Sequence, residues 1–176
     1  MKKGLIHYYF GNGKGKTTAA LGLMIRAAGY NKNVVIVQFL KDWKCGELQS
    51  FSHLPNICVL RGKSSGGNFV FEMTDKEKEE TKNIHNENLR RALEIQKKGQ
   101  CDLLVLDEVV DAYNLDLLDN TLFENLLENK PEALELVLTG HELNKYVCER
   151  ADYVTNMQKI KHPFDAGVSA RKGIEF

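Results

Sequence analysis

A glycine-rich loop near the start of the 176-residue chain has the residue types and spacing best suited to chemistry. Its members are Gly11, Asn12, Gly13, Lys14, Gly15, Lys16, Thr17 and Thr18. Glycines let a backbone curl until successive N–H groups point at one bound anion. A lysine adds a full positive charge there, and a threonine hydroxyl can bind Mg²⁺. The loop therefore predicts a site for the phosphates of a nucleotide, with charge from Lys16 and Lys14 and a metal ligand from Thr17.

The loop is shorter than most phosphate-binding loops. The common pattern G-x-x-x-x-G-K-[ST] would place its first glycine at position 10, where this chain has Phe10. Counted from Gly11, the loop is one residue short. A loop built differently is expected to hold a triphosphate differently, so the motif alone does not establish transfer of the terminal phosphate.

Two carboxylates follow a second apolar run much later in the chain. Residues 103–106 are all apolar, and Asp107 and Glu108 come directly after them. This is the form of a Walker B strand, whose carboxylate holds Mg²⁺ directly or through water. The sequence therefore predicts Mg²⁺ ligands at Thr17, Asp107 and Glu108. It leaves open which carboxylate approaches the metal, and whether the pair only ends a strand at the surface.

The elements that position these residues alternate between strands and helices. Strands are predicted at residues 5–10, 34–39, 57–60, 103–106, 134–138 and 153–157, and helices at residues 16–29, 74–98, 121–128 and 143–149. Thr74 with Glu77 has the pattern of a capping box at the start of the long helix. The alternation predicts an α/β protein, a three-layer P-loop NTPase-like fold with a mostly parallel central sheet. Such folds bind ligands at the carboxyl ends of their strands, where both motifs lie.

Length and composition indicate one soluble domain over residues 1–176, since no repeat or linker divides the chain. The 24 basic and 24 acidic residues cancel. Residues 1–50 nevertheless hold eight basic and two acidic residues, whereas residues 102–136 hold one basic and ten acidic residues. The balance excludes a broad nucleic-acid-binding surface, while the basic segment can meet phosphate and the acidic segment a metal.

Membrane and secreted classes are not expected either. No apolar run approaches the roughly 18 residues of a membrane-spanning helix. The N-terminal residues reach His7 before a secretory apolar region could form. The four cysteines stand far apart without a C-x-x-C pair, which is typical of idle or buried thiols in a reducing cytoplasm.

Several segments, in chain order, resemble the ATP:corrinoid adenosyltransferases of the bacterial cobalamin pathway. These segments are the loop with Ala19 and Ala20, residues 37–39, residues 106–108, Thr139 with Gly140, and the tail at residues 161–168 and 170–176. The resemblance covers nearly the whole chain, and the tail makes it specific. It implies an enzyme in which a cobalt(I) corrinoid attacks the ribose 5′ carbon of MgATP. A cobalt–carbon bond forms, and inorganic triphosphate leaves.

The resemblance also changes what the loop is expected to do. Lys16 and Thr17 would be catalytic because they stabilise a whole leaving triphosphate, whose charge develops at the α-phosphate end. The family binds its nucleotide in reversed orientation, which a shortened loop would suit. The resemblance further implies a homodimer and an electron-donating flavoprotein partner.

The corrinoid side is expected to use aromatic side chains. The family displaces the lower axial ligand of cobalt with two aromatics in a Gly-Phe-x-Trp-like segment, because four-coordinate cobalt is easier to reduce. Residues 67–72 correspond to that segment: Phe69 matches the first aromatic and Phe71 replaces the tryptophan. The resemblance thus implies catalytic roles for Phe69 and Phe71. The alternative is that the two residues form one core-facing side of a strand.

Other assignments stay open at this stage. Trp43 borders the corrinoid or covers a loop, His141 is a surface histidine or contacts substrate, and His162 and Asp165 belong to the site or to a packed tail. The alternative function is a P-loop ATPase or small-molecule phosphotransferase. A nucleotide-sensing or corrinoid-carrying protein without turnover is the third hypothesis.

Overall fold

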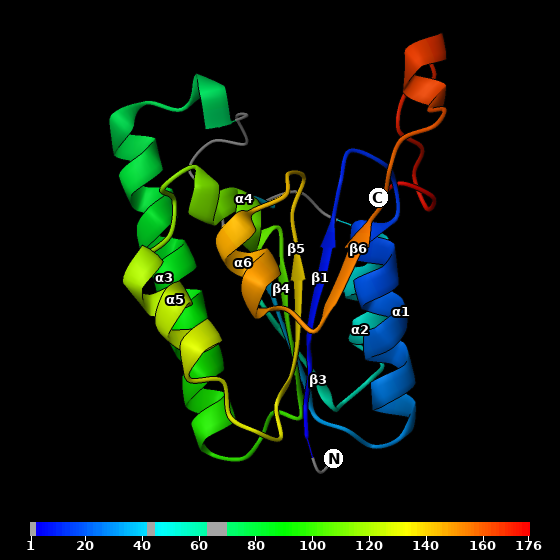
Figure 1. The fold of residues 1–176 in the computed structure, drawn as a ribbon. Helices are drawn as coiled ribbons and strands as arrows, with labels where there is room; N and C mark the ends of the chain where they lie inside the picture. The colour runs from blue at the N-terminus through cyan, green and yellow to red at the C-terminus, as the bar shows by residue number, and fades with distance from the viewer. Residues whose placement is uncertain (1–2, 42–44, 63–69) are drawn as a thin grey trace.

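The structure is a computed structural model that describes residues 3–41, 45–62 and 70–176 (Figure 1). Its described strands are β1 (Ile6–Phe10), β2 (Val34–Gln38), β3 (Ile57–Leu60), β4 (Leu103–Asp107), β5 (Glu135–Thr139) and β6 (Tyr153–Asn156). They form one sheet in the order β3-β2-β4-β5-β1-β6, and every pairing is parallel. The predicted strands and the parallel sheet are confirmed, with half of the strand ends shifted by one residue.

Helices cover both faces of this sheet (Figure 1). On one side lie α1 (Lys16–Gly29) and α2 (Gly46–Phe51), and on the other lie α3 (Asp75–Lys97), α4 (Val109–Asn114), α5 (Asn120–Glu128) and α6 (Lys145–Arg150). Alternate residues of the central strands feed two separate apolar clusters: Val34 and Ile36 pack with α1, whereas Val35 and Val37 pack with the opposite layer. Strands buried on both faces read as continuous apolar runs, which is why the sequence pattern located them. The three-layer α/β prediction is confirmed.

The long helix α3 begins as its sequence indicated. The Thr74 hydroxyl accepts a hydrogen bond from the Glu77 N–H at 3.3 Å, and the Glu77 carboxylate accepts one from the Thr74 N–H at 2.7 Å. This reciprocal arrangement satisfies two N–H groups that would otherwise lack partners at a helix start. The predicted capping box is confirmed.

Four short helical segments were not predicted. They are α2, α4 and the 3-10 turns η1 (Val70–Glu72) and η2 (Pro163–Ala166). Each is too short to show the apolar repeat of a helix. Helix α4 follows β4 after a single residue, Glu108, whose φ of 62° lies in the left-handed backbone region.

The carboxyl-terminal part of the chain differs from the rest in its packing. All residues of the edge strand β6 are exposed, and residues 158–176 are exposed apart from position 162. In Figure 1 this segment, orange to red, extends beyond the carboxyl end of the sheet. No helix in the part of the chain that the structure describes is both long enough and apolar enough to span a bilayer. The four cysteines are free, and Cys101 is buried.

Candidate active site

The glycine-rich loop runs from the end of β1 to the start of α1 and is fixed against the end of β6. The Gly11 N–H donates to the His141 carbonyl at 3.0 Å, and the Gly13 N–H donates to the Met157 carbonyl at 2.6 Å. A Cβ atom at Gly13 would lie 2.5 Å from that same Met157 oxygen, so no larger residue fits there. Gly11 and Gly15 both have φ 118°, a conformation that favours glycine. These glycines therefore shape the loop, which Asn12 also fastens by accepting from the Lys159 N–H at 2.9 Å.

Lys16 folds back over the loop from the first turn of α1. Its ammonium donates to the carbonyls of Gly11 at 2.6 Å and Gly13 at 3.0 Å. Burial lowers the pKa of Lys16, and the nearby carboxylates of Asp111 and Glu108 oppose that shift. The ammonium is thus held at the mouth of the loop, next to the positive end of a helix of 14 residues.

Five side chains meet beside the loop, one from the first turn of α1 and four from the ends of β2, β4 and β5, and we call them the strand-end corner. They are Thr17, Lys41, Asp107, Glu108 and Thr139. Asp107 is fully buried, and its Oδ1 accepts from Thr17 Oγ1 at 2.9 Å and from Thr139 Oγ1 at 2.8 Å. The Thr139 hydroxyl in turn accepts from the Glu108 N–H at 2.7 Å. The predicted convergence of Thr17 with the carboxylate pair is therefore observed, and Asp107 is the carboxylate bonded to Thr17.

Lys41 is a member of the corner that the sequence reasoning missed. Its ammonium lies 2.5 Å from Asp107 Oδ2, 3.3 Å from Glu108 Oε1 and 3.3 Å from Thr17 Oγ1. Burial by itself would lower the pKa of Lys41, but Asp107 and Glu108 outweigh it and raise that pKa. Burial raises the pKa of Glu108, and Lys41 opposes that rise. No motif in the sequence singles out this lysine, which is found once β2 is seen to end beside β4, with Gln38 in register with Asp107.

The oxygen atoms of the corner suit a magnesium ion. Thr17, Asp107 and Glu108 offer one hydroxyl and two carboxylates, the hard ligands that Mg²⁺ takes together with water and substrate phosphates. A cation already contacts all of them, since the Lys41 ammonium lies within 3.3 Å of each. No cluster of three His, Cys, Asp or Glu side chains suited to a metal occurs within residues 3–41, 45–62 and 70–176.

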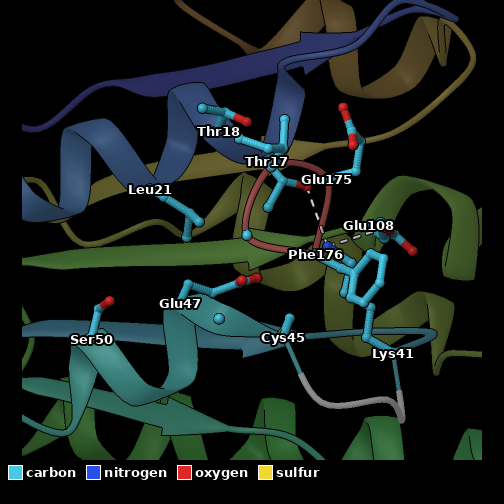
Figure 2. A pocket seen from close by; sticks show the side chains of 13 residues that line it. Thr17, Thr18, Leu21, Lys41, Cys45, Glu47, Ser50, Glu108, Glu175 and Phe176 are labelled. Carbon is cyan, nitrogen blue, oxygen red and sulfur yellow. Dashed lines mark hydrogen bonds and ion pairs between the residues drawn. The ribbon is translucent and has the colours of Figure 1, made fainter. Parts of the chain in front are cut away.

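Two hollows flank the loop, and the end of the chain lies between them. The larger, of about 630 Å³, is lined by Thr17, Lys41, Glu108 and the last residues, including Phe176 (Figure 2). The smaller, of about 290 Å³, is lined by the loop itself, and the two share Thr17, Thr18, Glu108, Ile174 and Glu175. The two hollows therefore meet at the first turn of α1, beside the phosphate loop.

The chain end is tied to the loop by charge. Glu175 pairs with Lys14 at 3.1 Å and with Arg171 at 3.1 Å. Hydrogen bonds from Arg171, with a further one from Lys14, hold the pKa of Glu175 down at about 2. Sequence reasoning did not foresee that Glu175 would lie at the loop, because no local pattern relates the two segments.

The histidines and the tail aspartate have different surroundings. His141 lies beside the loop on the smaller hollow, where Nδ1 lies 2.9 Å from Asp111, and that hydrogen bond raises the pKa of His141. His162 lines the same hollow. Asp165 instead pairs with Lys159 at 3.1 Å on the exposed tail.

Of the aromatic residues expected at the corrinoid, the structure describes only Phe71. Trp43 and Phe69 lie outside the described residues. Phe71 lies in the turn η1 and is 82 % exposed, so the alternative that it faces the core from a strand is wrong. The turn lies at the carboxyl end of the sheet, above α3 in Figure 1.

Comparison with known proteins identifies the family to which these features belong. A family model described as "ATP:corrinoid adenosyltransferase BtuR/CobO/CobP" matches residues 2–176. The corrinoid adenosyltransferase of Sinorhizobium sp is 32 % identical over 178 residues, covering 99 % of this chain and 81 % of that protein. The corrinoid adenosyltransferase of Escherichia coli (strain K12) is 31 % identical over 176 residues, covering 99 % of this chain and 87 % of that protein.

A solved structure supports the fold. EssC (ATPases 2 and 3) from Geobacillus thermodenitrificans superposes with a TM-score of 0.52 at 13 % identity, covering 97 % of this chain and 35 % of that chain. At this identity the likeness concerns the fold alone. The family model and the curated relatives carry the assignment: the chain belongs to the ATP:corrinoid adenosyltransferase family, enzymes that transfer an adenosyl group from ATP to a corrinoid.

Proposed function

We propose that the phosphate loop and the strand-end corner of this enzyme hold ATP so that its triphosphate leaves as one unit. The observation that carries this proposal is the convergence of Lys16, Thr17 and Asp107 at the carboxyl ends of the central strands. The cobalt(I) of the corrinoid supplies an electron pair to the ribose 5′ carbon, and the cobalt–carbon bond forms. The bond from that carbon to its oxygen breaks, and the triphosphate leaves with that electron pair.

The loop would stabilise the charge that develops on the leaving triphosphate. The Lys16 ammonium, now bonded to two loop carbonyls, is a fixed positive charge beside the first turn of α1. Preorganised charges of this kind lower the barrier because they need no rearrangement when the negative charge appears. The N–H groups of Gly11 and Gly13 donate to protein carbonyls, so in this proposal the two residues mainly set the loop's shape.

Thr17, Asp107 and Glu108 would hold the Mg²⁺ that accompanies the nucleotide. Bound there, the ion would neutralise part of the triphosphate charge. Asp107 is the better placed of the two carboxylates, since it already shares a hydrogen bond with Thr17. Thr139 would orient Asp107 through its own hydrogen bond to the same carboxylate oxygen.

The corrinoid would approach from the carboxyl end of the sheet, where the turn η1 lies (Figure 1). Phe71 offers an apolar surface there, because 82 % of it is accessible. Together with Phe69 it would form the apolar wall that displaces the lower axial ligand of cobalt. A histidine ligand to cobalt has no place in this scheme, since the lower position must stay empty.

Product analysis tests the proposed reaction. The protein is incubated with ATP and a chemically reduced cobalt(I) corrinoid, and both products are quantified by chromatography. Equal amounts of adenosylated corrinoid and inorganic triphosphate are expected. ADP with phosphate would instead identify an ATPase or phosphotransferase, and binding of both ligands without conversion would identify a carrier.

The setting of the enzyme is also proposed from the family resemblance. We infer a cytoplasmic homodimer that receives electrons from a flavoprotein. The exposed apolar side chains of the tail support a contact with another protein surface; they are Ile160, Phe164, Val168 and Ile174. Sedimentation velocity at several protein concentrations would give a dimer mass, and a monomer at all concentrations would contradict this inference.

A further inference from the structure

A lysine ammonium contacts the same oxygen groups that are proposed to bind magnesium. Lys41 follows β2 closely, and its ammonium reaches Asp107 at 2.5 Å and Glu108 at 3.3 Å. It also donates to Thr17 Oγ1 at 3.3 Å. Figure 2 shows it between Thr17 and Glu108, joined to both by dashed lines. The lysine and a metal ion therefore compete for one set of ligands.

The lysine is held in this place away from solvent. Its side chain is 9 % exposed, and that of Asp107 is fully buried. Its ammonium lies between two carboxylates, 2.5 Å from that of Asp107 and 3.3 Å from that of Glu108. Opposite charges at such distances attract far more strongly in a partly buried site than in water. The ammonium is thus a strong electrostatic partner for the carboxylates.

The backbone that presents Lys41 is fixed by a buried histidine. The preceding residue, Leu40, has φ 54°, a left-handed conformation that is uncommon for leucine. Its N–H donates to His85 Nε2 at 3.2 Å, while His85 Nδ1 donates to the Leu117 carbonyl at 2.7 Å. Both ring nitrogens of this α3 residue are used, so His85 determines where the chain turns after β2. The position of Lys41 is therefore built into the fold.

We propose that the Lys41 ammonium blocks the metal site. It leaves Asp107 and Glu108 only when a divalent cation arrives together with the phosphates of ATP. This inference rests on the proposed function, because it takes Thr17, Asp107 and Glu108 as the metal ligands. A free cation would have to expel a charged ammonium without offering it a new partner. The phosphates provide that partner, and the larger hollow is bordered by Lys41 as well as by Thr17 and Thr18. The enzyme would therefore take its metal as the metal–nucleotide complex.

Binding of Mn²⁺ alone to nucleotide-free protein tests this inference without reference to turnover. Free Mn²⁺ is counted by electron paramagnetic resonance during titration of wild type, Lys41→Gln and Lys41→Arg. Lys41→Gln is expected to bind Mn²⁺ at least about tenfold more tightly than wild type, because the competing charge is gone. Lys41→Arg keeps that charge and is expected to bind as weakly as wild type. Equal or weaker Mn²⁺ binding by Lys41→Gln would overturn the inference.

A second pair of variants keeps the inference testable if the first variant does not fold. If Lys41→Gln does not fold, Glu108→Gln is compared with the double variant Lys41→Gln/Glu108→Gln, in which one charge of each sign is removed. The double variant is expected to bind Mn²⁺ about tenfold more tightly than Glu108→Gln. Equal affinity of the two would contradict the role of Lys41.

The variant Asp107→Asn distinguishes failure of this inference from failure of the proposed function. Calorimetry measures the affinity of Asp107→Asn for Mn²⁺ with ATP. Undiminished affinity would show that the corner is not the metal site, and both proposals would fall. If Asp107→Asn binds Mn²⁺–ATP more weakly but Lys41→Gln binds Mn²⁺ no more tightly than wild type, only the proposed role of Lys41 is overturned.

Discussion

The surfaces proposed for the two substrates of this enzyme have opposite character. The strand-end corner is buried, and its carboxylate Asp107 has three side-chain partners within 2.9 Å. The surface proposed for the corrinoid is exposed, since 82 % of Phe71 is accessible. Charge chemistry needs fixed dipoles sheltered from water, which the ends of a packed sheet provide. The apolar wall proposed to displace the lower ligand of cobalt needs accessible apolar side chains, such as that of Phe71 in η1.

The sharpest way to break this contrast is to remove the charge of the loop. Lys16→Ala is expected to lower turnover by about 10²–10³-fold, the usual loss for one preorganised donor at a developing charge. Formation of adenosylated corrinoid under saturating substrates measures it. Lys14→Ala is the matched control, since its ammonium is half exposed and pairs with Glu175. An equal or larger loss in Lys14→Ala would contradict the assignment of roles within the loop.

Substitutions in the buried corner are expected to lower the free energy of unfolding more than substitutions in the exposed tail. Asp107→Asn leaves the Lys41 ammonium without its nearest carboxylate, and breaking a buried pair in this way costs about 3–5 kcal/mol in free energy of unfolding. Asp165→Asn removes an exposed pair with Lys159 on the tail and is expected to change nothing measurable. Urea unfolding of both variants provides the comparison. Comparable destabilisation of the two would mean that the tail packs as tightly as the corner.

On the exposed side, Phe71→Ala is expected to spare the fold and impair one step. Burial of a phenylalanine side chain against a ligand contributes about 1.5–3 kcal/mol, which corresponds to roughly a tenfold loss or more. That loss is expected when the enzyme starts from cobalt(II) with a reductant, and a smaller loss when it starts from pre-reduced cobalt(I). Equal losses from both starting states would assign Phe71 a structural role instead.

The smallest expected effect is on the pH dependence of stability, through His85. Burial lowers the pKa of His85, although its hydrogen bond to Leu117 acts in the opposite direction. A group whose folded pKa is depressed stabilises the fold fully above its unfolded pKa of about 6.5. That contribution is lost as pH falls below this value toward the folded pKa.

The variant His85→Gln isolates this contribution. The difference in free energy of unfolding between wild type and variant is expected to be largest near pH 8 and to shrink as the pH falls below about 6.5. Urea unfolding across this range measures it. A difference that grows on acidification would mean that the histidine is charged in the folded protein.

The sequence located the loop and the carboxylates of the candidate site much better than its exposed part. Asp107 was located because β4 is an unbroken apolar run, and the loop because glycines and Lys16 follow a strand. Lys41 was missed because it stands three residues beyond the end of β2 and belongs to no motif. It becomes visible only when the register of β2 with β4 is known.

The exposed part could not be derived from local patterns. Phe69 and Phe71 stand two apart, a spacing shared by strands, but Phe71 belongs to a 3-10 turn before α3. The path that brings Glu175 to Lys14 depends on how the chain leaves β6, and no repeat in the sequence encodes it. Surfaces of this kind depend on tertiary contacts, which local sequence patterns do not predict.

An ATP analogue tests the central claim most directly, namely that the site expels an intact triphosphate. In β,γ-imido ATP the bond that ATPases and phosphotransferases cleave resists cleavage, whereas the bond at the ribose 5′ carbon is unchanged. With cobalt(I) corrinoid, the enzyme is expected to form adenosylated corrinoid from this analogue and to release the imido-triphosphate intact. Failure to adenosylate the corrinoid from the bound analogue, while ATP yields ADP and phosphate, would contradict the account.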